Sequence, residues 1–306
     1  MVVYVDPRLI GRANYNSLVE RYPNIEFVIE TNRHKEIEVL FTMPKLVKEM
    51  NLIDYPKLKW IQYLMAGYDG VDVELINNSN IIFCNAQDIF SKSIAEDVIT
   101  KILYFNRNIK YYIQAMKEGR WEPIKEEPEL TSSTALILGV GSIGKELAKR
   151  LKSFEMTVIG YRNNMILEEN FDKIITTNAD LNSALKIADY VILALPLADS
   201  TLYMFDKDKF ELMKETALFI NVARGKIVNQ NDLYLALLNK NIRGAGLDVF
   251  DPEPLPKDHP LWNLDNVYIT PHNASSSPYM RERLYQMILM NLDLYLAKKP
   301  VKYQIN

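Results

Sequence analysis

Three side chains suited to proton transfer and anion binding each follow an apolar run of the chain. They are Arg224 in FINVARGKIVN, Glu253 in GAGLDVFDPEPLP and His272 in YITPHNASS. Histidine exchanges protons near neutral pH, and a neighbouring carboxylate favours the protonated ring and fixes its orientation. The arginine fork matches a carboxylate and can polarise a carbonyl. The three groups together are suited to reducing a 2-oxo acid, because a proton must reach the carbonyl oxygen.

Histidine and glycine are scarce, which narrows the search for active residues. The chain has 3 histidines and 11 glycines in 306 residues. His259 lies beside a proline and is interpreted as a loop residue, and His34 lies in a charged, solvated segment. Each of the three active-site candidates alone would be an ordinary surface residue. Their joint occurrence after predicted strands favours catalysis, because ligands gather at the carboxyl ends of parallel strands.

A glycine cluster in LILGVGSIGKELAKRL follows an apolar strand and opens an amphipathic helix. This is the context of a dinucleotide-binding turn. Gly139 permits the tight turn, Gly141 lets the backbone approach a pyrophosphate, and Gly144 lets the helix pack on the sheet. Free amides at the helix start, around Ser142 and Ile143, would bind the phosphates. A strand-to-helix turn without a ligand is the alternative.

The next strand ends in TVIGYRNN, which bears on the choice between NADH and NADPH. A carboxylate usually follows this strand and binds the ribose hydroxyls. Here the position carries Arg162, with Asn163 behind it, and Glu168 lies past the strand end. Arginine can pair with a ribose 2′-phosphate, so NADP is preferred and NAD is possible. A solvated surface charge is the other interpretation of Arg162.

Apolar runs alternate with helical patterns along the whole chain, which predicts an α/β protein with parallel sheets. After residue 134 the series predicts a doubly wound sheet of the Rossmann type. Residues 91–119 predict one long helix or a kinked pair, with Ser93 and Glu96 as a capping box and Gly119 as its end. A final helix is expected from about Tyr279 to Ala297.

Composition excludes several classes of function. The net charge of −3 and the sequence pI of about 5.8 give no basic surface for nucleic acid. The single cysteine, Cys84, cannot form an intrachain disulfide and is expected to be buried. No Cys/His spacing predicts a metal site, and no apolar stretch is long enough for a membrane span. The start, MVVYVDPRLIGR, predicts a strand and no secretion signal, so we expect a cytoplasmic protein.

An ordered set of motifs resembles the D-isomer-specific 2-hydroxyacid dehydrogenases, of the glyoxylate and hydroxypyruvate reductase kind. The motifs are GVGSIG, LPLADST, NVARG, GLDVFDPEPLP, HPLW and TPH, together with the long helix containing IAEDV. The resemblance implies that Arg224 holds the substrate, His272 is the acid and base, and Glu253 is its partner. It implies cofactor contacts from a second group: Leu195, Pro196, Thr201, Val222, Ala223 and Asp248.

The resemblance also extends to the first part of the chain. LMAGYD resembles the substrate loop of the family, where the amides of Ala66 and Gly67 would receive the substrate carboxylate. It further implies a homodimer built around the helix 91–119. We expect a discontinuous, flavodoxin-like substrate domain of residues 1–96 and 277–306 and a dinucleotide-binding domain of residues 97–276, with a cleft and a hinge between them. The alternatives are an amino-acid dehydrogenase and a non-catalytic dinucleotide sensor of the co-repressor kind.

Overall fold

The computed structural model describes residues 1–305, except the side chain of Thr31. The chain forms two compact units. The first consists of Met1–Phe90 and the residues from Ser277 onward, and the second of Ser91–Ser276. The first crossing lies at 90/91, six residues before the expected 96/97, because the helix that begins at Ser91 packs entirely within the second unit. The return crossing lies at the expected 276/277.

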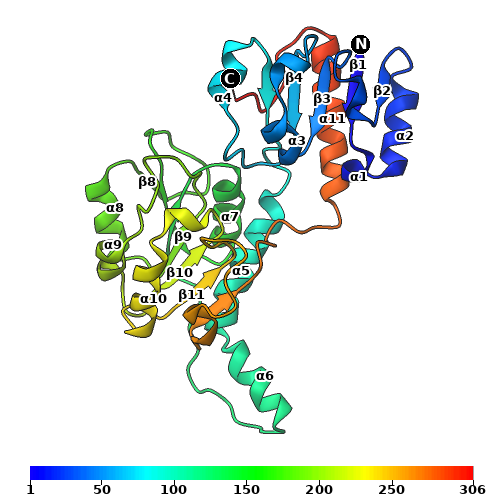
Figure 1. The fold of residues 1–306 in the computed structure, drawn as a ribbon. Helices are drawn as coiled ribbons and strands as arrows, with labels where there is room; N and C mark the ends of the chain where they lie inside the picture. Colours follow the sequence, from blue (N-terminus) through cyan, green and yellow to red (C-terminus); the bar gives the residue numbers. More distant parts are fainter. Residues whose placement is uncertain (306) are drawn as a thin grey trace. The chain divides into compact units, whose positions relative to one another are not determined.

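The first unit contains a parallel sheet of five strands in the order β2-β1-β3-β4-β5, the flavodoxin order. Trp60 of β4 and Phe41 of β3 are fully buried, and Trp60 packs on Tyr295 of the last helix. That helix therefore completes the core of the first unit (Figure 1). The elements are β1 (Val2–Val5), α1 (Pro7–Ile10), α2 (Arg12–Arg21), β2 (Glu26–Val28), β3 (Val39–Thr42), α3 (Pro44–Glu49), β4 (Trp60–Tyr63), α4 (Val73–Asn78), β5 (Ile82–Cys84) and α11 (Met280–Leu296), with single 3-10 turns at Thr31–Arg33 and Leu52–Asp54.

The second unit contains a parallel sheet of seven strands in the order β12-β11-β10-β9-β6-β7-β8. Strands β6, β7 and β8 are added toward one edge of the sheet, and β9 to β12 are added toward the other edge, starting beside β6. This switch in strand order is that of a doubly wound Rossmann fold, so the predicted fold class is confirmed. The strands and early helices are α5 (Ser91–Asn106), α6 (Ile109–Lys117), β6 (Thr134–Leu138), α7 (Ser142–Lys152), β7 (Thr157–Tyr161), β8 (Lys173–Ile175) and α8 (Asn178–Leu185). The remaining elements are β9 (Tyr190–Leu193), α9 (Lys207–Leu212), β10 (Leu218–Asn221), α10 (Gln230–Leu238), β11 (Gly244–Leu247) and β12 (Val267–Ile269), with 3-10 turns at Gly225–Ile227 and Pro260–Asn263.

The central strands of this sheet are buried along their whole length, as expected for parallel strands covered on both faces. Helices α8, α9 and α10 contribute to one continuous core that includes Phe205, Phe210 and Phe219. Helices α5 and α7 pack against each other (Figure 1). Helix α5 also packs on β10 and β11, and α7 on β6 and β7. Strand β11 has the sequence GAGL, so α5 can approach its backbone closely.

Of the two forms expected for residues 91–119, one long helix or a kinked pair, the structure has the pair. Helix α5 ends at Asn106, and Asn108 adopts a left-handed conformation with φ 46° before α6 begins. Helix α6 extends away from the rest of its unit and ends before Gly119, whose φ is 65° (Figure 1). The capping box is wrong, because α5 starts at Ser91 and Ser93 lies inside its first turn, where the hydroxyl donates to the carbonyl of Ser275 at 3.2 Å.

Cys84 is buried in β5, as expected, and burial raises the pKa of its thiol to about 12. Among the helices of residues 1–305, none combines the length and the apolar character that a membrane crossing requires.

Candidate active site

His272 and Glu253 form a direct contact at the carboxyl end of the second sheet. Nδ1 of His272 lies 2.8 Å from Oε2 of Glu253, and Oε1 of Glu253 accepts from the amide of Phe250 at 2.9 Å. The carboxylate is therefore fixed at both oxygens. When Nδ1 donates to Glu253, Nε2 is the ring atom that can exchange a proton with a ligand. The side chains keep 48% and 37% of their surface exposed, so a ligand can reach them.

Arg224 follows β10, and its loop packs against the loop that carries Glu253. A Cβ on Gly225 would overlap the carbonyl oxygen of Phe250, so only glycine allows the two loops to lie this close. The Arg224 guanidinium donates to the carbonyl of Ala223 at 2.7 Å, and the side-chain amide of Asn221 donates to the carbonyl of Arg224 at 3.1 Å. The structure thus brings Arg224, Glu253 and His272 to one edge of one sheet.

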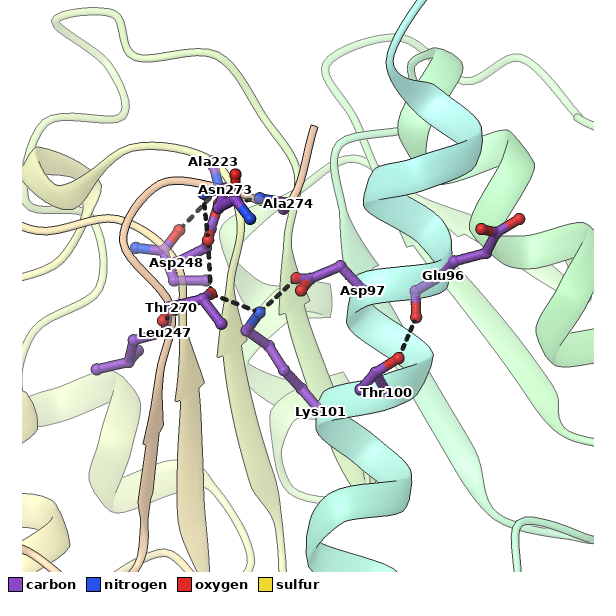
Figure 2. Close-up of polar contacts among 11 residues, drawn as sticks. Glu96, Asp97, Thr100, Lys101, Ala223, Leu247, Asp248, Thr270, Asn273 and Ala274 are labelled. Carbon is purple, nitrogen blue, oxygen red and sulfur yellow. Dashed lines mark hydrogen bonds and ion pairs between the residues drawn. The ribbon is translucent and has the colours of Figure 1, made fainter. Parts of the chain in front are cut away.

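The segment that carries His272 is tied to the buried carboxylate of Asp248. The amide of His272 donates to the carbonyl of Asp248 at 2.8 Å. Oδ1 of Asp248 accepts from the amide of Asn273 at 2.9 Å, and Oδ2 accepts from the amide of Ala274 at 3.0 Å (Figure 2). The backbone of His272 has a φ of 51°, an uncommon conformation for a residue with a side chain. Asp248 therefore accepts hydrogen bonds from three successive backbone amides, those of His272, Asn273 and Ala274.

The glycine turn borders a cavity of about 690 Å³ within the second unit. A Cβ on Gly139 would lie 2.5 Å from the carbonyl oxygen of Ala194, and one on Gly144 would overlap the carbonyl oxygen of Gly139, so both glycines serve close packing. A Cβ on Gly141 would enter open space. Gly141 precedes α7, whose first amides receive no side-chain cap. This arrangement fits a dinucleotide, because free amides and a helix N-terminus bind a pyrophosphate.

The same cavity is lined by Arg162 and Asn163, which follow β7. Arg162 donates to Oε1 of Glu168 at 2.9 Å, and Lys145 pairs with Oε2 of the same carboxylate at 2.8 Å. The hydrogen bond from Lys145, and to a smaller extent that from Arg162, holds the pKa of Glu168 below its usual range. Two cations and one carboxylate therefore meet where the ribose end of a dinucleotide is expected.

The sequence-family model described as the D-isomer specific 2-hydroxyacid dehydrogenase, NAD binding domain, matches residues 99–274. The chain belongs to the D-isomer specific 2-hydroxyacid dehydrogenase family. A glyoxylate reductase from Korarchaeum cryptofilum is 34% identical to it over 244 residues, which cover 78% of this chain and 73% of the relative. The chain is thus an NAD(P)-dependent 2-hydroxyacid dehydrogenase, as the sequence predicts, and the family match favours neither an amino-acid dehydrogenase nor a sensor.

Solved structures share the fold over the whole chain. A D-isomer specific 2-hydroxyacid dehydrogenase family protein from Aeromonas salmonicida subsp. salmonicida matches with a TM-score of 0.85 and 29% identity, over 100% of this chain and 98% of the other. An acyclic imino acid reductase in complex with NADPH and D-Arg matches with a TM-score of 0.86 and 25% identity over 100% of both chains. Both cover the complete two-unit architecture of the dehydrogenase.

The structure gathers only part of the predicted cofactor set around the cavity. Gly139, Gly141, Arg162, Asn163, Leu195, Pro196 and Thr201 line it. The hydroxyl of Thr201 accepts from the amide of Ala198 at 2.8 Å and donates to the carbonyl of Pro196 at 2.9 Å, which shapes the wall of the cavity. The other predicted residues are not among those that line this cavity: Ser142, Ile143, Gly144, Val222, Ala223 and Asp248.

The predicted substrate loop of the dehydrogenase lies in the first unit, between β4 and α4. The side-chain amide of Asn85 donates to the carbonyl of Ala66 at 2.8 Å, and the amide of Ala86 donates to the carbonyl of Met65 at 2.9 Å. These bonds occupy the backbone carbonyls of Ala66 and Met65 in the loop. Asn85 itself is buried and accepts, through its backbone carbonyl, a bond from Gln62 at 2.9 Å.

Sequence reasoning gave no role to one group in the dehydrogenase and missed a second. The first is Glu168, which faces Arg162 although it lies past the strand end. The second is the set that joins the buried Lys101 of α5 to Asp97 of the same helix and to Thr270 (Figure 2). A signal for the second was present, since Lys101 falls at helical spacing on the apolar stripe of α5, where a solvated lysine would not be expected.

Proposed function

We propose that the dehydrogenase uses NADPH to reduce a small 2-oxo acid, with glyoxylate and hydroxypyruvate as the expected substrates, and forms the D-2-hydroxy acid where the product carbon is chiral. The observation that carries the catalytic assignment is the contact of 2.8 Å between His272 and Glu253, beside the loop of Arg224. The named activity of the Korarchaeum relative supports the choice of substrate.

In the proposed mechanism, protonated His272 donates a proton from Nε2 to the carbonyl oxygen of the substrate. When bound, reduced nicotinamide supplies the hydride that the carbonyl carbon accepts. Glu253 stabilises the imidazolium before the transfer and keeps Nδ1 as the donor to its carboxylate. His272 leaves the step neutral and regains its proton from solvent. The reverse reaction uses the same atoms, with His272 as the base.

Arg224 is assigned to the substrate carboxylate and the carbonyl oxygen, because its guanidinium offers several donors in a fixed plane. The backbone amides of Ala66 and Gly67 are assigned to the same carboxylate. The support for the loop is local: Asn85 and Ala86 occupy the carbonyls of Ala66 and Met65, which fixes the peptide planes of the loop.

NADP is the proposed cofactor, with NAD as a weaker alternative. Arg162 and Lys145 bring two positive charges together, and Glu168 neutralises only one of them. A ribose 2′-phosphate would add the missing negative charge and accept from the arginine fork. The presence of NADPH in the related imino acid reductase is consistent with this choice.

We also propose a cytoplasmic homodimer that forms through the segment 91–119. Helix α6 exposes Ile113 and Met116, and Trp121 beyond it is 99% exposed. A cluster of large apolar side chains on an extended helix is typical of a protein interface.

Steady-state rates on a panel of 2-oxo acids, each with NADPH and with NADH, test the proposal. A second arm adds ammonium, because an imino acid reductase or amino-acid dehydrogenase would require an amine. His272→Ala should lower kcat by about 10²–10⁴-fold and leave the dissociation constant of NADPH unchanged. Wild-type turnover in His272→Ala would refute the acid and base assignment. If turnover depends on ammonium, the substrate is an imino acid and the proposed 2-oxo acid substrate is wrong.

A further inference from the structure

Lys101 is a fully buried lysine on α5, with none of its side-chain surface exposed. It occupies the apolar stripe of the helix together with Ile94, Val98 and Ile102, all of which are buried. An ammonium removed from water is costly unless charged and polar groups surround it. The position therefore requires partners within the protein.

The second sheet makes space for this side chain. A Cβ on Gly246 of β11 would lie 2.9 Å from Cβ and Cδ of Lys101, so the aliphatic stem occupies the volume that a side chain at 246 would fill. Nζ lies 5.6 Å from the ring centre of Tyr268 on β12, within the range of a cation–π interaction. The stem is thus directed past β11 toward the end of β12.

The ammonium has two polar partners on opposite sides. It forms a short ion pair with Oδ2 of Asp97, one turn earlier on α5, and it donates to Oγ1 of Thr270 at 2.9 Å (Figure 2). Burial raises the pKa of Asp97, while Lys101 opposes that shift. Thr270 lies two residues before His272, so the lysine reaches the segment that carries the catalytic candidate.

Hydrogen-bond direction links Lys101 to Asp248. Because Nζ donates to Oγ1 of Thr270, the single proton of the Thr270 hydroxyl is available to another acceptor. Oδ1 of Asp248 lies 2.5 Å from that hydroxyl, the nearest acceptor to it. The result is a directed chain from the ammonium through the hydroxyl to the carboxylate.

The carboxylate at the end of this chain holds the backbone on both sides of His272. Asp248 receives the amides of Asn273 and Ala274 on its side chain and that of His272 on its carbonyl. The left-handed backbone of His272 is a conformation that persists only when its surroundings fix it. Without the ammonium, the partly buried carboxylate of Asp97 and the buried carboxylate of Asp248 would lie on either side of Thr270 without the positive charge that Lys101 now supplies.

We propose that Lys101 is a positioning residue for catalysis: acting through Thr270 and Asp248, it fixes the backbone that aims His272. This inference rests on the proposed role of His272. It assigns to α5, a helix outside the cofactor-binding turn, an indirect effect on the geometry of proton transfer. Lys101 contacts neither substrate nor cofactor in this proposal.

Isosteric variants of Thr270 test the proposal without altering charge. Thr270→Val keeps the shape of the side chain and removes the hydroxyl, whereas Thr270→Ser keeps the hydroxyl. We expect Thr270→Val to lower kcat at least tenfold with the dissociation constant of NADPH within twofold of wild type, and Thr270→Ser to retain kcat within threefold. Lys101→Met should lower kcat to a similar extent. Lys214→Met is the control, because it removes a lysine from an ion pair of 2.8 Å with Asp189 in the same unit, whose side chains are 36% and 33% exposed.

The double variant Lys101→Met/Thr270→Val separates a shared path from two independent packing defects. If both residues act through Asp248, kcat of the double variant equals that of the worse single variant. A loss equal to the product of the two single losses would overturn the proposal, as would wild-type kcat in Thr270→Val or a Thr270→Ser variant as slow as Thr270→Val. If Lys101→Met does not fold, kcat of Thr270→Val compared with kcat of Thr270→Ser still tests the proposal. Wild-type turnover in His272→Ala would instead refute the proposed function, so the two failures are distinguishable.

Discussion

Glu253 connects the ring of His272 to the backbone of Phe250, with one carboxylate oxygen 2.8 Å from Nδ1 and the other 2.9 Å from the amide. The carboxylate is therefore held by a rigid group on one side and presents its charge to the imidazole on the other. This arrangement fixes both the orientation and the tautomer of the ring.

Replacing Glu253 by Gln should lower kcat about tenfold, less than the loss expected for His272→Ala. The amide oxygen can still accept from Nδ1, but it carries no charge to stabilise the imidazolium. Steady-state kinetics with saturating NADPH measures the effect. Unchanged kcat in Glu253→Gln would remove the carboxylate from the mechanism.

The glycine turn offers a pair of variants that separates cofactor binding from folding. Gly141→Ala places its methyl in open space and should leave the melting temperature unchanged while weakening NADPH binding about tenfold, because the methyl occupies the approach of the pyrophosphate. Gly144→Ala would overlap the carbonyl of Gly139 and should lower the melting temperature by several degrees. Equal NADPH affinity in Gly141→Ala and wild type would argue against pyrophosphate binding at this turn.

Arg162 and Glu168 should have opposite effects on the choice of cofactor. Arg162→Gln removes the fork that would pair with a 2′-phosphate and should lower the ratio of kcat/KM for NADPH over NADH about tenfold or more. Glu168→Gln releases Arg162 and Lys145 from their carboxylate and should raise that ratio. Both ratios follow from initial rates with each cofactor. A wild-type preference for NADH would contradict the NADP proposal.

Asn85 should affect the 2-oxo acid and not the dinucleotide. Asn85→Ala removes the bond to the carbonyl of Ala66 and should raise KM for the 2-oxo acid several-fold with the dissociation constant of NADPH unchanged. Asn14→Ala is the control, because Asn14 also donates to a backbone carbonyl of the first unit, that of Ile10 at 3.0 Å. If Asn85→Ala has the KM of wild type, the loop at Ala66 and Gly67 does not receive the substrate.

The exposed apolar face of α6 predicts the effect of an added charge. Met116→Asp, at a side chain 74% exposed, should leave the fold of each chain intact and shift the mass in solution from twice 35.5 kDa toward 35.5 kDa. Light scattering coupled to size-exclusion chromatography measures the mass. A monomeric wild type would refute the homodimer.

The succession of strands along the chain, the glycine turn and the catalytic candidates could be proposed from sequence because each depends on local pattern. Fully apolar strands predict a parallel sheet, and Arg224, Glu253 and His272 each follow such a strand. The start of α5 could not be predicted from Ser93 and Glu96, because the capping pattern also occurs inside a first turn whose serine binds a distant carbonyl, that of Ser275. Contacts between residues far apart in the chain decided that case.

The same reason explains why Glu168 was given no role and why Lys101 was missed. Glu168 reaches Arg162 because the segment after β7 turns back toward the strand end, and strand periodicity does not describe that turn. Lys101 lies 169 positions before Thr270, and nothing near it in the sequence indicates its partner. A lysine on an apolar helical stripe signals that a buried partner exists, but only the packing of α5 on β11 identifies it.

Helix α11 has a consequence for the order in which the chain can fold during synthesis. Its side chains complete the core around Trp60, yet all of the second unit is translated between that strand and this helix. The second unit is therefore available to fold while the first still exposes an apolar sheet face to solvent. A ribosome-bound chain that stops before Tyr279 should hold a folded dinucleotide unit beside an unfinished sheet, and the late arrival of residues 280–296 would be the event that closes it.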